Sequence, residues 1–101
     1  MIATVYAVFA SAHEAERIGR QMVEEARAAC VNILGPCRSI YRWQGQVETA
    51  EEVPALFKVA SDKAQALVDA IAAAHSYDVP AIAVWSIAHA PESYETWVTG
   101  I

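Results

Sequence analysis

Cys30 and His75 are the side chains of this 101-residue sequence that best suit a soft or borderline metal ion such as copper or zinc. Each follows a stretch with helical periodicity, so we expect both at the same end of a sheet. A tight site would need a third ligand from Cys37, His89 or another copy of the chain, and no Cys-x-x-Cys or His-x-x-x-His spacing is present. The alternative is structural: Cys30 as a small buried hydrophobe and His75 as a helix-end cap.

Lys58 lies within an apolar, strand-like run at 53–60, where a lone charge is costly unless it is paired. We therefore expect Lys58 to form a buried ion pair with Glu51, Glu52 or Asp78, either within the chain or across a boundary between copies. The functional alternative is an anion bound in a cleft between copies of the chain.

Glu48, Glu51 and Glu52 form an acidic stretch that could bind a hard divalent cation through its carboxylates. The Asp/Asn/Gly pattern of a calcium loop does not accompany them. A solvated arm that discourages edge-to-edge aggregation is the simpler interpretation.

An enzyme has little support in this sequence. Cys30 and His75 could act as nucleophile and base. However, the chain has four glycines and shows no nucleophile elbow, oxyanion-hole signature or phosphate-binding loop. We expect a protein without catalytic activity and without an organic cofactor.

Composition limits the class of protein further. The length fits one domain, residues 1–101, and the net charge of -5 with scattered basic residues argues against nucleic-acid binding. No apolar run is long enough to span a membrane, and the apolar start lacks the basic residues of a secretory signal. Two cysteines make no disulfide framework, so a reducing, cytoplasmic location is expected.

Apolar periodicity predicts two strand–helix–strand units joined by a hairpin. Ser11 and Glu14 have the spacing of a capping box at a helix start, and Pro54, which cannot donate a ladder bond, is expected at an edge, bulge or strand start. The predicted segments are strands at 2–9, 30–34, 38–43, 53–60 and 81–87, a helix after Ser11, a second helix capped by Ser61-Asp62, and a short last turn. This order is typical of an α+β, ferredoxin-like split βαβ fold, an antiparallel sheet with two helices on one face.

The segment 39–48 is predicted to be a long, protruding β-hairpin that turns at Gln44-Gly45. Its aromatic residues near the turn call for a partner surface, and a second copy of the chain is the simplest partner. Two aromatic residues near the end, three positions apart, share one face of a helical turn. The residues expected at an interface between copies are Tyr41, Trp43, Tyr94 and Trp97.

A set of segments lies along the chain in a specific order and spacing: Ala28–Ile33, Ser39–Gly45, Glu51-Glu52, Lys58, His75–Pro80 and Tyr94-x-x-Trp97. In these segments, and over essentially its whole length, the chain resembles the divalent-cation-tolerance (CutA) family. The resemblance implies a ferredoxin-like subunit in a tight homotrimer, with the hairpin strands shared between subunits. It also implies a link to tolerance of copper and other divalent metals. Some members have a further cysteine where this chain has Phe9.

The expected function is therefore that of a trimeric divalent-cation-tolerance protein that binds copper, as Cu(II) or Cu(I), or a similar metal ion, through Cys30 and His75. Two alternatives stay open. One is a small-ligand or signalling module like the PII proteins, with Lys58, Tyr77 and Glu52 at a cleft between subunits. The other is a stable trimeric scaffold without a site of its own.

Overall fold

A computed structural model describes residues 1–101 as a mixed α+β domain. Its elements are β1 (Ile2–Phe9), α1 (Ala12–Glu24), β2 (Cys30–Ile33), β3 (Cys37–Trp43), β4 (Gln46–Ala60), a short 3-10 turn (Ser61–Lys63), α2 (Ala64–Ala74), β5 (Ile82–Ser86) and α3 (Glu92–Thr99). The predicted first strand and the hairpin are confirmed at the predicted positions. The predicted last turn is an eight-residue helix.

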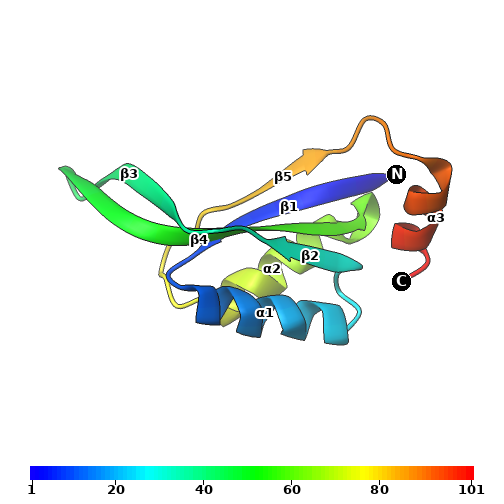
Figure 1. Ribbon diagram of the computed structural model, residues 1–101, viewed down its shortest axis with the longest axis horizontal. Coiled ribbons are helices and arrows are strands. Elements are labelled where there is room, and N and C mark those ends of the chain that lie inside the picture. Colours follow the sequence, from blue (N-terminus) through cyan, green and yellow to red (C-terminus); the bar gives the residue numbers. More distant parts are fainter.

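The antiparallel sheet has the strand order β2-β4-β1-β5, and both α1 and α2 lie against the same side of it (Figure 1). Alternate residues of β1 and β4 point toward these helices and form the core with Ile18, Leu67 and Ile71. We call the opposite side the open face; the alternation of the paired strands places Thr4, Tyr6, Lys58 and Trp85 on it. On that face Tyr6 and Trp85 stack at 5.5 Å.

The β3–β4 hairpin projects beyond the body of the sheet, and the molecule measures 45 × 26 × 23 Å (Figure 1). Trp43 pairs with Gln46 across a two-residue turn whose members have positive φ, 51° at Gln44 and 80° at Gly45. Such a turn matches the right-handed twist of the strands. The predicted protruding hairpin is therefore present.

Pro54 lies in the middle of β4 and not at an edge or a strand start. Its carbonyl accepts the Leu34 N–H at 3.0 Å, so its nitrogen faces the same side of β4. On that side β2 ends at Ile33 and β3 begins at Cys37, which leaves a gap of three residues in the ladder. The missing N–H of Pro54 falls opposite this gap, where no ladder bond is required.

The two helices begin in different ways. Ser11 caps α1 by accepting the Glu14 N–H at 3.1 Å, and the Glu14 carboxylate accepts the Ala10 N–H at 3.1 Å. This confirms the predicted cap. Before α2, by contrast, the chain makes a 3-10 turn without a side-chain cap, and the buried Ser61 hydroxyl has no partner. The cap predicted at Ser61-Asp62 was wrong.

α3 closes one end of the open face. Its buried Val98 packs with Ile2 and Ala29, and Tyr94 lies against this small second cluster. The Met1 ammonium group pairs with Glu95 at 3.1 Å and fastens the start of β1 to the same helix. No helix is long and apolar enough to cross a membrane.

Glu14 joins the start of α1 to the turn that follows α2. It is 7% exposed, and its second oxygen accepts the Ser76 N–H at 2.9 Å. Burial alone would raise its pKa, but the hydrogen bonds from Ser76 and Ala10 hold the pKa of this carboxyl below its usual value.

Replacing Glu14 with Gln is expected to lower the free energy of unfolding at neutral pH by about 1–3 kcal/mol, because buried N–H groups lose a charged acceptor. Since folding lowers this pKa, the contribution is present above the ordinary value of 4.5 and is lost as the pH falls through the folded value. Urea unfolding at neutral and acidic pH measures the difference, with the exposed Glu24→Gln as control. An equal deficit at both pH values would contradict the role given to the carboxylate charge.

Candidate functional site

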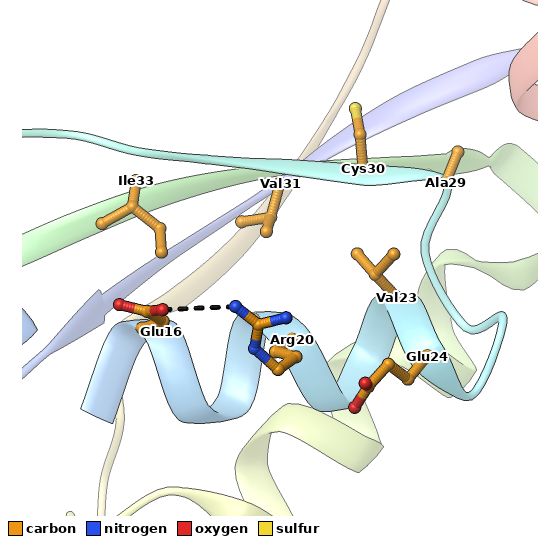
Figure 2. A pocket seen from close by; sticks show the side chains of 9 residues that line it. Glu16, Arg20, Val23, Glu24, Ala29, Cys30, Val31 and Ile33 are labelled. Carbon is orange, nitrogen blue, oxygen red and sulfur yellow. Dashed lines mark hydrogen bonds and ion pairs between the residues drawn. The ribbon is translucent and has the colours of Figure 1, made fainter. Parts of the chain in front are cut away.

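Cys30 stands at the start of β2, directly opposite Lys58 on β4. Figure 2 shows its thiol on the side of the sheet away from α1. The sulfur is half-buried, and its side-chain contact is the Tyr94 hydroxyl at 3.7 Å. Burial, together with this contact, raises the pKa of Tyr94 to about 12. Cys30 is a free thiol with one weak polar neighbour on the open face.

His75 ends α2 and is held from three sides. Its ring stacks on Phe9 at 5.1 Å, its Nε2 lies 2.7 Å from the Val8 carbonyl oxygen, and its Nδ1 lies 3.0 Å from the Tyr77 nitrogen. The Tyr77 N–H must donate to Nδ1, so the proton of the ring is on Nε2, which donates to Val8. Both nitrogens of this neutral ring are occupied, and neither offers a free lone pair to a metal.

The structure does not bring Cys30 and His75 together. Cys30 and Thr4 both lie opposite Lys58, on either side of β4, so Cys30 is at the level of Thr4 in the sheet. His75 instead bonds to Val8, four residues further along β1. At about 3.4 Å per residue, this separates them by about 14 Å along the strand. The expected convergence at one end of the sheet was wrong, because the chain leaves α1 and α2 at opposite ends of β1. Within the chain, no three His, Cys, Asp or Glu side chains lie close enough to hold a metal ion.

The residues considered as a third ligand lie elsewhere. Cys37 is opposite Glu52, six residues along β4 from the partner of Cys30, a separation of about 20 Å. His89 lies in the connection between β5 and α3. Phe9, which replaces the cysteine of some relatives, is fully buried beneath His75. This end of β1 is therefore an apolar packing site.

Lys58 forms no ion pair within the chain, so a pairing with Glu51, Glu52 or Asp78 of the same copy was wrong, and a pairing across a boundary between copies stays a prediction. Its Nζ donates instead to Asn32 Oδ1 at 2.9 Å, diagonally across β2 and β4. Lys58 is half-exposed, so a neutral acceptor suffices for its ammonium group. Asn32 was missed by sequence reasoning, although an amide within a short apolar strand is a signal that a polar partner is nearby.

Tyr77 and Glu52 meet at the base of the hairpin, where β1 has ended and the loop after α2 passes β4. The Tyr77 hydroxyl donates to Glu52 Oε2 at 2.8 Å, and Glu52 is 8% exposed. Burial and the hydrogen bond to this carboxylate raise the pKa of Tyr77 to about 12. Lys58 lies six residues further along β4, about 20 Å away, so these three residues form no common cleft in one chain.

Three of the four aromatic residues predicted at an interface are exposed in the single chain. Tyr41, Trp43 and Trp97 are 42%, 44% and 49% exposed, whereas Tyr94 is half-buried and stacks on Trp97 at 6.0 Å. In the acidic arm, Glu48 and Glu51 are exposed and form no ion pair. Only Glu52 of this arm is buried, and its carboxylate accepts the bond from the Tyr77 hydroxyl.

A shallow groove of about 450 Å³ lies between α1 and the edge strand β2 (Figure 2). Val31 and Ile33 point from β2 toward the helix and form its floor, while Glu16, Arg20 and Glu24 stand along the helix side. Arg20 bonds to Glu16 at 3.3 Å. Of the predicted site residues, only Cys30 borders this groove.

Taken together, the chain is an α+β domain with an antiparallel sheet, helices on one side and a free thiol on the other. Comparison with known proteins agrees with this description. The sequence matches the family described as CutA1 divalent ion tolerance protein over residues 3–100. The chain belongs to this family.

Individual relatives show how similar the chain is to other members in sequence and in structure. The divalent-cation tolerance protein CutA of Thermus thermophilus is 39% identical over 84 residues, covering 83% of this chain and 82% of the relative. The solved structure of the Archaeoglobus fulgidus protein, described as periplasmic, has a TM-score of 0.93 at 35% identity and covers 97% of this chain and 95% of its own. The Thermus structure gives a TM-score of 0.94 at 36% identity, with 99% and 97% covered. Relatives are named for divalent-cation tolerance and not as enzymes.

Replacing Tyr77 with Phe is expected to lower the free energy of unfolding by about 1–2 kcal/mol, because the buried Glu52 carboxylate loses its donor. Tyr6→Phe is the matched control, since the Tyr6 ring is half-buried and its hydroxyl has no hydrogen bond within the chain. Urea unfolding of both variants makes the comparison. Equal losses would show that the Tyr77–Glu52 bond contributes nothing.

A tyrosine titration should show a late step that belongs to Tyr77 and Tyr94. Tyr77 and Tyr94 should ionise near pH 12, later than an ordinary tyrosine at about 10. Because folding raises these pKa values, their stabilising contribution is present below pH 10 and is lost as the pH rises through about 12. Ultraviolet absorbance of the wild type, Tyr77→Phe and Tyr94→Phe should show one late group lost in each variant. A late step that keeps its full amplitude in both variants would refute this assignment.

Proposed function

We propose that this chain is a homotrimeric protein that binds copper or a similar divalent metal ion and contributes to metal tolerance. The observation that carries the proposal is Cys30, a half-exposed free thiol on the open face with only a weak contact to Tyr94. Family membership supports the connection with divalent cations. A thiolate is the ligand that favours Cu(I), and it also suits other soft or borderline ions.

Assembly into a trimer is supported by apolar surface that the single chain leaves uncovered. Trp43 and Tyr41 on the hairpin, Trp85 on the open face and Trp97 on α3 are all exposed to a large extent. A patch of this kind is typical of an interface between copies. The two βαβ halves and the strand order β2-β4-β1-β5 further support assignment to the ferredoxin-like fold class.

The metal site of this proposal is shared between copies of the chain. One chain supplies Cys30 but brings no three His, Cys, Asp or Glu side chains together. A complete set of ligands at Cys30 would therefore include groups from a neighbouring copy or from solvent, which gives modest affinity. His75 would have to give up its bond to Tyr77 before it could bind a metal ion, so we assign it a structural role.

Copper titration by calorimetry on the reduced protein, with the native mass recorded in parallel, tests the proposal. Cys30→Ala should weaken copper binding about tenfold or more, because it removes the thiolate ligand. It should leave the native mass unchanged, because Cys30 is not part of the buried core. Cys37→Ala is the matched control and should bind like the wild type. His75→Ala should lower the midpoint of unfolding and leave copper affinity within about twofold.

Undiminished copper binding by Cys30→Ala would refute the metal site. A wild-type native mass of one chain would refute the trimer. If copper does not bind to the wild type at all, the protein has no metal site of its own, and the scaffold alternative remains.

We also propose a cytoplasmic location, because two unpaired cysteines suit a reducing compartment. The relative from Archaeoglobus fulgidus is described as periplasmic, so location differs within the family if this proposal is correct. Cell fractionation with compartment markers would decide it.

A further inference from the structure

The turn after α2 is held by three successive residues, each joined to a different element, and we call residues 75–77 the clasp. The first bonds to β1 through its ring, and the second donates its N–H to Glu14 of α1. The third, Tyr77, donates its hydroxyl to Glu52 of β4. Glu52 pairs with Cys37, the first residue of β3, so the clasp meets β4 where the projecting hairpin begins.

His75 can hold the clasp only while its ring is neutral. Its Nδ1 accepts the Tyr77 N–H at 3.0 Å, and its Nε2 carries the ring proton toward the Val8 carbonyl oxygen. A second proton can bind only at Nδ1, and a charged imidazole has two donors and no acceptor. Two N–H groups would then face each other, so protonation must break the bond to Tyr77. Histidine is the side chain whose charge ordinarily changes between about pH 8 and pH 5.

The charged groups around this ring allow it to take up a proton. Glu14 attracts a positive ring, and Arg17, 3.9 Å from the Glu14 carboxylate, offsets part of that attraction. From β1, the apolar ring of Phe9 stacks on His75. Further ionisable groups lie beyond the ring, namely Tyr77, Glu52 of β4 and Tyr41 of β3. The two carboxylates accept clasp bonds, so protonation of either one weakens the clasp in the same direction as protonation of the ring.

His75 positions both the backbone and the side chain of Tyr77. The backbone N–H bonds to Nδ1, and the Tyr77 ring lies against the imidazole with 4.8 Å between the ring centroids. The hydroxyl reaches Glu52 from this position. Loss of the bond to Nδ1 therefore also removes the support for the contact between the turn and β4.

We propose that the clasp is an acid-sensitive latch: mild acid protonates His75, releases Tyr77 and frees the turn from β4 while the rest of the domain stays folded. The main core consists of apolar side chains and does not take up protons. When the latch opens, the base of the hairpin loses its contact with the turn, and the Glu52 carboxylate becomes accessible to solvent. The release needs neither a metal ion nor a second copy of the chain, so it can fail or succeed independently of the proposed function.

A pH titration of the full chain by nuclear magnetic resonance tests the latch. The other two histidines, His13 and His89, are exposed and serve as internal references. The His75 ring should titrate between about pH 8 and 5.5. The protection of the Tyr77 amide from hydrogen exchange should fall about tenfold with the same midpoint, because that amide loses its acceptor. The amide of Val5 in the central strand should keep its protection.

His75→Asn separates the proton from the hydrogen bond. The side-chain oxygen of asparagine can accept the N–H two residues further on, as the ring nitrogen does, but it does not titrate in this range. Protection of the Tyr77 amide in this variant should not depend on pH. His13→Asn is the matched control: it removes an exposed histidine and should keep the wild-type transition.

Three results in the wild type would overturn the latch, and they hold even if His75→Asn does not fold. The His75 ring gains its proton while the Tyr77 amide stays protected; the ring stays neutral down to about pH 5.5; or Tyr77 and Val5 lose protection together, which is global unfolding. An unchanged transition in His75→Asn would also overturn it, because the proton would then act elsewhere in the clasp. A shared midpoint for ring and amide, abolished in His75→Asn and kept in His13→Asn, supports the latch.

Discussion

The length of β4 is the constraint on which the rest of the structure depends. It has fifteen residues, but β1 pairs with eight of them, from Val53 to Ala60. Beyond that point β4 has only β3 for a neighbour and must leave the body of the sheet as a hairpin. The change occurs at Val53 and Pro54, where β1 ends on one side and the ladder is interrupted on the other. Past the end of β1, β4 is paired on one side only, by β3, so the two strands continue as a two-stranded arm.

The same register decides what the chain leaves exposed. The side of β1 and β4 that faces α1 and α2 is buried by helices, but the open face receives only α3 at one end. A two-stranded arm has no helix of its own to cover its aliphatic side chains, and isolated hairpins are marginally stable in water. Uncovered apolar surface on both the arm and the open face therefore has one physical origin. The domain has more sheet than its two long helices can cover.

The parts of this structure that depend on neighbours in sequence could be predicted, and those that depend on strand register could not. Ser11 and Glu14 are three residues apart and form the predicted cap because each reaches only the adjacent turn. Gln44-Gly45 likewise determines its own turn. By contrast, Asn32 meets Lys58 only because β2 pairs with β4 in one particular register. The separation of Cys30 from His75 arises in the same way, since the two helices end at opposite ends of β1.

Because Cys30 and His75 are separated, the polar side chains at the two ends of the sheet differ in how well they are hydrogen-bonded. At the hairpin end, His75, Tyr77, Glu52 and Glu14 satisfy one another or the backbone through short hydrogen bonds, and such a network is rigid because each group would be costly to unpair. At the other end, Cys30 has one contact at 3.7 Å, and displacing it costs little. The soft ligand Cys30 thus lies where its side chain has only one weak hydrogen-bond contact to lose. Because no three metal-binding side chains of one copy come together, a complete coordination set at Cys30 would need groups from outside the chain. Under the proposed function, metal binding at Cys30 and the association of copies would therefore be linked: a metal ion that bridges two copies would stabilise their contact, and the contact would raise the local concentration of the second ligand.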